Sequence, residues 1–349
     1  MAYDAFDVLS TEGLLNYTST QEVTYNKLEK FFPTSTSTDE RLVVQDLDVN
    51  YSPTALAVAE NTVAPLAQRP TFESQVIDFV EFKLEHRLTD KQIRILRNPR
   101  DVFELQDYEN RVFNDVDRLI NAHNIARERI RAGLLLTGKV DINENGFNPD
   151  PVDWGIPVDQ IVNIDFEKDD VLEKLFQFQQ TISERQGKNL GRMLISKDIE
   201  FKMRNNPSIK TALSDYSSKN PRRLMISELQ DVLREQVGFT YEILTDENGD
   251  SYGYTPTPNG KKIPFIPNDK CILLPGGDSQ KLGDTVYNIT TEQLELGAQQ
   301  GVDTQQAGNI FLFSNYTIRP VNFIITAVSR FTVTYPLAKA SYVLTQHTD

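Results

Sequence analysis

The longest uninterrupted helical pattern in the chain runs from Asn98 to Gly138. Asn98 is a suitable N-cap, Pro99 suits the first helical position, and Gly138 is a suitable stop. A helix over 99–137 would be about 57 Å long, which exceeds the diameter of a small domain, so its ends must pack against different parts of the molecule. Its predicted buried face carries apolar or aromatic residues three or four apart: Leu105, Tyr108, Val112, Val116, Leu119, Ala126, Ile130 and Leu134.

The composition of the chain limits the classes of protein that could contain this long helix, called the spine helix below. The chain has 349 residues, a length that favours two lobes. Its formal net charge of −14 disfavours a nucleic-acid ligand, because phosphate binding needs concentrated Lys and Arg. Its single cysteine, Cys271, excludes an internal disulfide framework and lies in an apolar, strand-like run typical of a buried thiol. No apolar run reaches the ~18 residues of a membrane span. The N-terminus lacks the basic start of a signal peptide, so we expect a cytoplasmic protein.

The segments ahead of the spine helix have too few apolar residues to form a core of their own. Residues 1–32 are predicted to be an arm that orders only on another surface. Strand-like patterns at 41–51 and 74–86 enclose more than twenty residues with three prolines. This connection is either a projecting loop that packs on a neighbouring molecule or an Ω-loop folded on its own domain. Local chemistry leaves both open.

After the spine helix, Asn145-Gly146 is the strongest hairpin signal in the chain. From about residue 163, helical and strand-like patterns alternate in a compact α+β lobe of roughly 130 residues. Near the end, Phe331, Val333 and Tyr335 alternate with polar residues as strand faces do. These last strands are predicted to return to the sheet beside the spine helix.

The residue types that carry chemistry are few and scattered. His86, His123 and His347 have no metal-ligand spacing, and His123 falls on the buried stripe, where a hydrogen-bonded core histidine is expected. Gly276-Gly277 lacks the lysine and helix of a phosphate loop. The common catalytic and nucleotide-binding motifs are absent. The sequence therefore predicts no catalytic residue, metal or cofactor, and favours a protein whose function is its shape.

The order of these elements resembles the major capsid proteins of tailed bacteriophages, in particular the lambda gpE-like branch of the Hong-Kong-97-type fold. The best local match is the helix end and hairpin over 134–146, followed by the Asp-Trp-Gly run at 153–155. Supporting matches are Phe31-Phe32-Pro33, Tyr51-Ser52-Pro53, the segment from Ile263-Pro264 to Leu274-Pro275, and Asn322-Phe323.

The resemblance implies an α+β capsid fold with a spine helix, an extended E-loop, and peripheral (P) and axial (A) domains. The expected parts are an N-terminal arm at 1–42, the E-loop and its strands at 43–82, a P-domain with the spine helix and hairpin at 83–162, an A-domain at 163–300, and C-terminal strands returning to the P-domain at 301–349. The expected E-loop contacts with neighbouring subunits are Leu56, Val58, Val63, Leu66, Arg69 and Phe72. Gly133, Gly138 and Gly155 are hinge candidates, with helix-end packing as the alternative explanation.

The implied function is a head protein that self-assembles as pentamers and hexamers into an icosahedral shell around the phage genome. Implied partners are other copies of the chain, a separate scaffolding protein, a portal, optional decoration proteins, and DNA packaged without sequence-specific contact; no membrane is involved. The implied location is the virion, after assembly in the bacterial cytoplasm. Lys83 and Lys139 are present, but no motif places them for covalent cross-linking. The alternatives are an encapsulin-like compartment and, more distantly, a soluble hydrolase using acidic residues.

Overall fold

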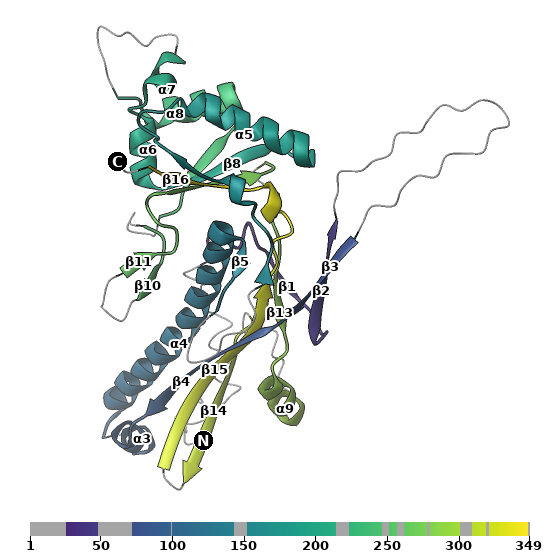
Figure 1. Cartoon of the computed structure of the whole chain (residues 1–349). Helices are drawn as coiled ribbons and strands as arrows, with labels where there is room; N and C mark the ends of the chain where they lie inside the picture. Colours follow the sequence, from purple (N-terminus) through teal and green to yellow (C-terminus); the bar gives the residue numbers. More distant parts are fainter. Residues whose placement is uncertain are drawn as a thin grey trace, which may run out of the picture. The chain divides into compact units, whose positions relative to one another are not determined.

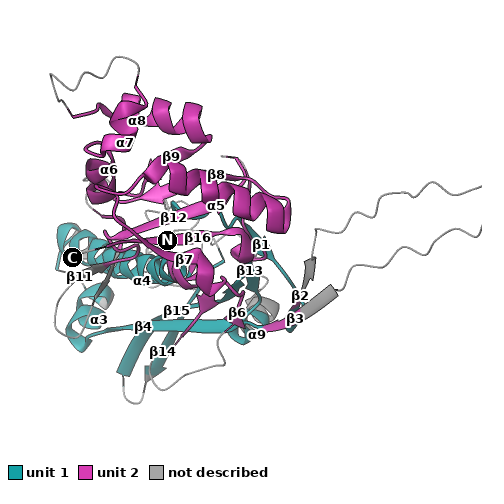
Figure 2. Cartoon of the chain, turned by 45° about the horizontal axis from the view of Figure 1, so that its top comes forward, with its two compact units in different colours: residues 1–42, 78–130, 284–333 teal, residues 43–77, 131–283, 334–349 magenta. Residues whose placement is uncertain are grey.

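The computed structural model describes residues 26–47, 72–98, 100–142, 152–213, 223–245, 251–256, 262–277, 280–300, 309–318 and 321–347. The chain divides into two compact units, each assembled from separated stretches of sequence (Figure 2). Unit 1 comprises residues 1–42, 78–130 and 284–333, and unit 2 comprises residues 43–77, 131–283 and 334–349. Among the helices of the described residues, none combines the length and apolarity that a membrane span requires.

The predicted spine helix is confirmed as α4, Val102–Thr137 (Figure 1). Its end is as predicted, because Gly138 adopts a φ of 69° and its N–H donates to Leu134 O at 2.8 Å. Its start is not. Asn98 is the C-cap of a separate helix, α3 (Asp90–Arg97), and the Asp101 carboxylate instead accepts from the N–H of Glu104 at 2.7 Å.

Helix α3 has start and stop signals of its own. Thr89 and Gln92 form a capping box that starts α3 independently. Helix α3 ends with its C-cap Asn98, the residue before Pro99, and helices usually end at or before the residue that precedes a proline.

Unit 1 is built on a sheet whose central strand is β15 (Val321–Val333). Strand β4 (Val80–Leu88) pairs antiparallel along one side of β15, and β14 (Phe311–Ile318) and β13 (Thr285–Asn288) pair antiparallel along the other. Helices α3 and α4 pack on this sheet. Their shared core consists of Leu88, Ile93, Leu96, Val112, Val116, Leu119, Ile310, Leu312, Phe323, Ile325 and Ala327.

The described part of the predicted N-terminal arm belongs to unit 1. Leu28, Phe31 and Phe32 are almost completely buried, and β1 (Thr34–Thr36) pairs parallel with β13. These residues therefore lie on another surface, as expected of an arm, and that surface is α4 and β13 of unit 1. Three large apolar side chains within five positions are enough to fix a segment that has no periodic pattern.

Unit 2 contains a mixed five-stranded sheet in the order β7-β16-β12-β8-β9. Helices α5 (Val171–Gln186), α6 (Lys197–Met203), α7 (Pro207–Thr211) and α8 (Ile226–Val232), with the π-helical turn Leu233–Val237, contribute apolar residues to its core. The strands of this sheet are β7 (Ile161–Ile164), β16 (Tyr342–Gln346), β12 (Lys270–Pro275), β8 (Leu190–Ile195) and β9 (Thr240–Ile243).

Strand β16 corrects the prediction that all the C-terminal strands return to the sheet beside the spine helix. β14 and β15 do so, but β16 lies between β7 and β12 in unit 2. Its residues are mostly buried, and the alternation of apolar residues that predicts a strand does not specify which sheet it joins. As predicted, Cys271 is fully buried, in β12.

Short elements complete the described structure. The predicted hairpin after α4 is confirmed as the antiparallel pair β5 (Lys139–Val140) and β6 (Val152–Asp153), with the Asn145-Gly146 turn outside the described residues. Strands β2 (Arg41–Leu47) and β3 (Phe72–Asp78) pair with each other, as do β10 (Tyr254–Pro256) and β11 (Lys262–Pro264). Helix α9 (Thr291–Gln300) and two 3-10 turns, Val158–Gln160 and Ala338–Ala340, are the others.

Candidate assembly site

The strand pair β2–β3 forms the described base of the predicted E-loop. Val43 and Val76 are 58% and 56% exposed on it, and Arg41 forms an ion pair with Asp78 at 3.0 Å. A two-stranded ribbon is at best marginally stable in water unless something covers its apolar side chains. Of the predicted loop contacts, Leu56, Val58, Val63, Leu66 and Arg69 lie outside the described residues, and Phe72 is the first residue of β3.

One hydrogen bond connects this ribbon to the hairpin after α4 within unit 2. The Gln75 side chain on β3 donates to the Asp153 carbonyl oxygen on β6 at 3.3 Å. On the same hairpin, the Asp153 carboxylate accepts from the N–H of Gly155 at 2.8 Å and pairs with Lys139 at 2.9 Å. The spacing of polar residues in the sequence does not reveal the Gln75 contact, because its partner is a backbone atom far along the chain.

The three glycines predicted as hinge candidates occupy different environments. Gly138 and Gly155 have φ values of 69° and 72°, which L-residues with side chains rarely adopt. A Cβ at Gly138 would lie 2.7 Å from Ile156 Cγ1. Gly133 is inside α4, and a Cβ there would meet nothing within 4 Å. Local geometry therefore requires glycine at Gly138 and Gly155 but not at Gly133.

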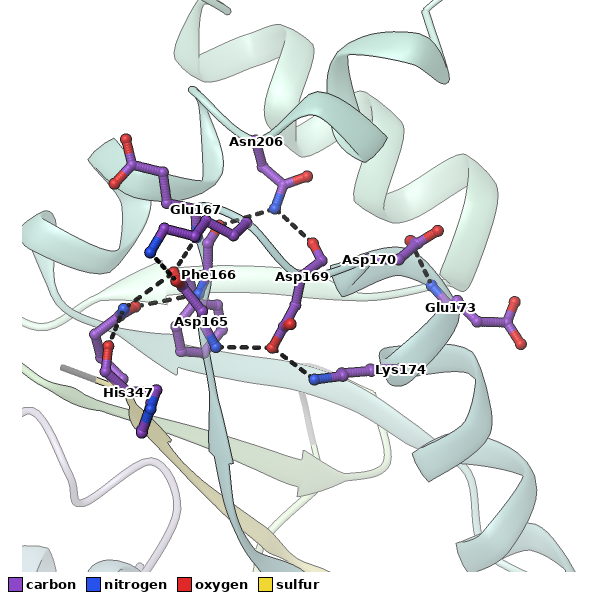
Figure 3. A network of polar contacts seen from close by, with 11 residues as sticks. Asp165, Phe166, Glu167, Asp169, Asp170, Glu173, Lys174, Asn206 and His347 are labelled. Atoms are coloured by element: carbon purple, nitrogen blue, oxygen red, sulfur yellow. Dashed lines mark hydrogen bonds and ion pairs between the residues drawn. The ribbon is translucent and has the colours of Figure 1, made fainter. Parts of the chain in front are cut away.

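A polar network holds together the loop before α5, the α6–α7 junction and the end of β16 in unit 2 (Figure 3). The fully buried Asn206 donates to the carbonyl oxygens of Phe166 at 3.0 Å and Asp169 at 2.8 Å. Its own side-chain oxygen accepts from the N–H groups of Ser208 and Ile209, which caps α7.

Two carboxylates and the last described strand complete this network. Asp169 accepts from Lys174 Nζ at 2.6 Å and from the N–H of Asp165 at 2.9 Å. These interactions, the first above all, lower the pKa of the Asp169 carboxyl. The Gln346 side chain on β16 donates to Asp165 and accepts from the N–H of Phe166. The network therefore fixes segments that are far apart in sequence, and its geometry is that of a structural support.

Unit 1 contains a second group of buried polar side chains, along α4. Fully buried Glu128 accepts from the N–H of Leu28 at 3.1 Å, and Arg127 donates to the Tyr287 hydroxyl at 2.8 Å. His123 lies 2.8 Å from Ser329 Oγ, which confirms the predicted core histidine. Burial lowers the pKa of His123 to about 4, so the imidazole is neutral near pH 7.

The described residues contain little reactive chemistry. No group of three or more His, Cys, Asp or Glu side chains in this part of the chain could hold a metal ion. Burial raises the pKa of the Cys271 thiol far above its usual range, which makes it unreactive. The hydrogen bond from Lys83 to Glu292 raises the pKa of that amine. Both Lys83 and Lys139 are thus held by carboxylates of their own chain.

Known structures define the class of protein to which this fold belongs. The putative capsid protein of a prophage from E. coli CFT073 superposes with a TM-score of 0.59 at 15% identity, covering 99% of this chain and 100% of that one. A phage-related protein from Bordetella bronchiseptica RB50 gives a TM-score of 0.51 at 12% identity, with 95% of each chain covered. The fold is that of the Hong-Kong-97-like phage capsid proteins.

The family follows from the sequence itself. Residues 10–320 match the model of the family described as phage major capsid protein E, and the chain belongs to that family. No curated protein matches its sequence. The protein is a bacteriophage major capsid protein with a structural role in an icosahedral shell, which confirms the predicted family, fold class and function. This membership favours a phage head over the encapsulin alternative, and it indicates a structural protein rather than the hydrolase alternative.

Proposed function

We propose that this capsid protein assembles as pentamers and hexamers around a separate scaffolding protein, with a portal at one vertex and optional decoration proteins outside. Assembly would take place in the host cytoplasm, and the finished shell would hold DNA without sequence-specific contact. The observation that carries the proposal is the family membership over residues 10–320. The net charge of −14 supports the last part, because a strongly acidic subunit does not attract phosphate groups.

The proposed contact between subunits is the E-loop, with its apolar residues Leu56, Val58, Val63 and Leu66 together with Arg69 and Phe72. The exposed Val43 and Val76 support this proposal, because a partner surface would cover them. Many weak contacts of this kind give a stable shell when each subunit makes several of them.

Electron microscopy of the purified protein, alone and with its scaffolding protein, tests the assembly proposal. We expect closed particles of uniform size with pentameric and hexameric clusters on their surface. A subunit that stays monomeric or dimeric at micromolar concentration in the presence of scaffold would contradict it. Deletion of residues 58–72 should leave a folded subunit that forms no shells, and particles of normal size from that variant would show that the E-loop assignment is wrong.

We also propose that Gly133, rather than Gly138 or Gly155, is the hinge that adapts one sequence to both pentamers and hexamers. The support is that neither φ nor packing requires glycine at Gly133, whereas glycine in a helix interior is destabilising. Gly133→Ala should stabilise the isolated subunit and reduce the yield of closed shells. Shells of unchanged size and yield would contradict the hinge role.

A further inference from the structure

Basic side chains gather at one end of unit 1. Residues 87–100 contain five Lys or Arg and a single Asp, in a chain whose net charge is −14. Within this stretch, α3 and the start of α4 border a hollow of about 830 Å³ whose other lining includes Tyr316 and Val321, from the β14–β15 hairpin of the same unit. The hollow combines positive charge with aromatic and aliphatic walls.

The lining of this hollow carries more positive than negative charge. Lys91, Arg94 and Arg100 line it with exposed side chains, and none of the three forms an ion pair among the described residues. The one carboxylate in the lining, Glu104, accepts from the N–H of Arg100 at 2.8 Å. Three unpaired cations around one concave surface favour an anionic occupant.

The chain itself contains a segment of matching chemistry. Residues 1–25 carry four carboxylates, Asp4, Asp7, Glu12 and Glu22, and no Lys or Arg. Tyr3 and Phe6 alternate with the first two of these acids, so the segment offers aromatic side chains as well as negative charge. Both properties complement the walls of the hollow.

The segment is also long enough to reach the hollow within one subunit. It leaves the described structure at Asn26, whose side chain accepts from Arg127 on α4 at 3.5 Å. From Arg127 to Glu104, α4 rises by about 35 Å. The residues between Glu12 and Asn26 span up to about 46 Å when extended. A tether of this length gives an effective concentration in the millimolar range, so even weak contacts would be populated.

We propose that the acidic segment Tyr3–Glu12 docks in the basic hollow formed by α3, the start of α4 and the β14–β15 hairpin of its own subunit. The docked carboxylates neutralise Lys91, Arg94 and Arg100, and the aromatic residues contact the apolar walls. Nucleic acid is the competing anionic ligand. The tethered segment is favoured because the net charge of the chain opposes binding to phosphate groups.

Zero-length carbodiimide coupling tests the docking on unassembled, full-length subunits, independently of shell formation. It joins an amine to a carboxylate in contact, so we expect peptides that link Lys91 to Asp4, Asp7 or Glu12. The Arg94→Glu/Arg100→Glu variant and ~0.5 M salt should each reduce this link at least about fivefold, because the attraction is electrostatic and screened. Arg234→Glu, an exposed charge reversal in unit 2, should leave the link unchanged.

Several results would overturn the proposal. One is the absence of any link between Lys91 and the segment in wild-type subunits. Another is a link that forms only between isotopically distinct chains in a mixed sample, which would place the segment on a second copy. A third is that wild-type subunits bind a short DNA duplex, and that Arg94→Glu/Arg100→Glu abolishes this binding but leaves the link between Lys91 and the segment intact. Circular dichroism and a milder Arg94→Gln/Arg100→Gln variant show whether a lost link reflects lost folding.

Discussion

At the scale of single residues, Asn206 connects more segments of unit 2 than its size suggests. Its side chain makes hydrogen bonds to Phe166, Asp169, Ser208 and Ile209 and is completely buried. Asn206→Ala leaves several buried polar groups without partners, so we expect a loss of about 2–4 kcal/mol in the free energy of unfolding, measured by urea denaturation.

Two further variants show whether this loss comes from the network. Asn206→Asp replaces the donating nitrogen with a buried carboxylate oxygen that faces the carbonyl oxygens of Phe166 and Asp169, so it should destabilise at least as much as Asn206→Ala. Gln177→Ala removes an exposed hydrogen bond on α5 and should change stability by less than about 0.5 kcal/mol. Equal stability of Asn206→Ala and Gln177→Ala would contradict a supporting role for Asn206.

The acid stability of unit 2 depends on Asp169. Because the ion pair with Lys174 lowers its pKa in the folded state below the ordinary value of 3.8, the unfolded chain binds the proton more readily. This contribution to stability is therefore present above about pH 4 and is lost as the pH falls below it. Asp169→Asn should show a smaller drop in melting temperature than wild type between about pH 5 and pH 3. Parallel curves for the two proteins would exclude this linkage.

At the scale of elements, the end of α4 depends on Gly138. Gly138→Ala forces a residue with a Cβ into positive φ, at a cost of about 1–2 kcal/mol, and brings that Cβ to 2.7 Å from Ile156 Cγ1. We expect a lower melting temperature from calorimetry. The matched substitution Gly133→Ala, inside the same helix, should raise stability by about 0.5–1 kcal/mol. If both substitutions changed the stability of the subunit in the same direction, the helix would not end at Gly138 as the structure shows.

The elements differ in how far the sequence predicts them, and the reasons are physical. The spine helix, its glycine stop and the hairpin after it depend on local periodicity and turn chemistry, so they could be predicted. The break between α3 and α4 follows Asn98, the residue before Pro99, and the Thr89–Gln92 capping box that starts α3 is likewise a local signal. The sheet that β16 joins, and the contact between Glu128 and Leu28, depend on residues far apart in the chain, which no local pattern encodes.

At the scale of the whole molecule, each unit combines stretches from distant parts of the sequence, and helix α4 passes from unit 1 to unit 2 between Ile130 and Arg131. The order of elements could be read along the chain and matched to a capsid family. The assignment of segment 26–36 to unit 1 could not be predicted from the sequence, because it depends on pairing with β13 and on burial of residues far apart in the chain.

The net charge of −14 should govern how fast subunits associate. Like-charged subunits repel one another over about 10 Å at 0.1 M salt and over about 3 Å at 1 M, so shell growth, followed by light scattering, should accelerate as salt is raised. Asp231→Asn/Glu235→Gln neutralises two exposed carboxylates and so reduces the magnitude of the net charge, from −14 to −12. This variant should assemble faster than wild type at low salt and equally fast at high salt. Slower assembly with added salt would show that attractive ion pairs between subunits outweigh this repulsion.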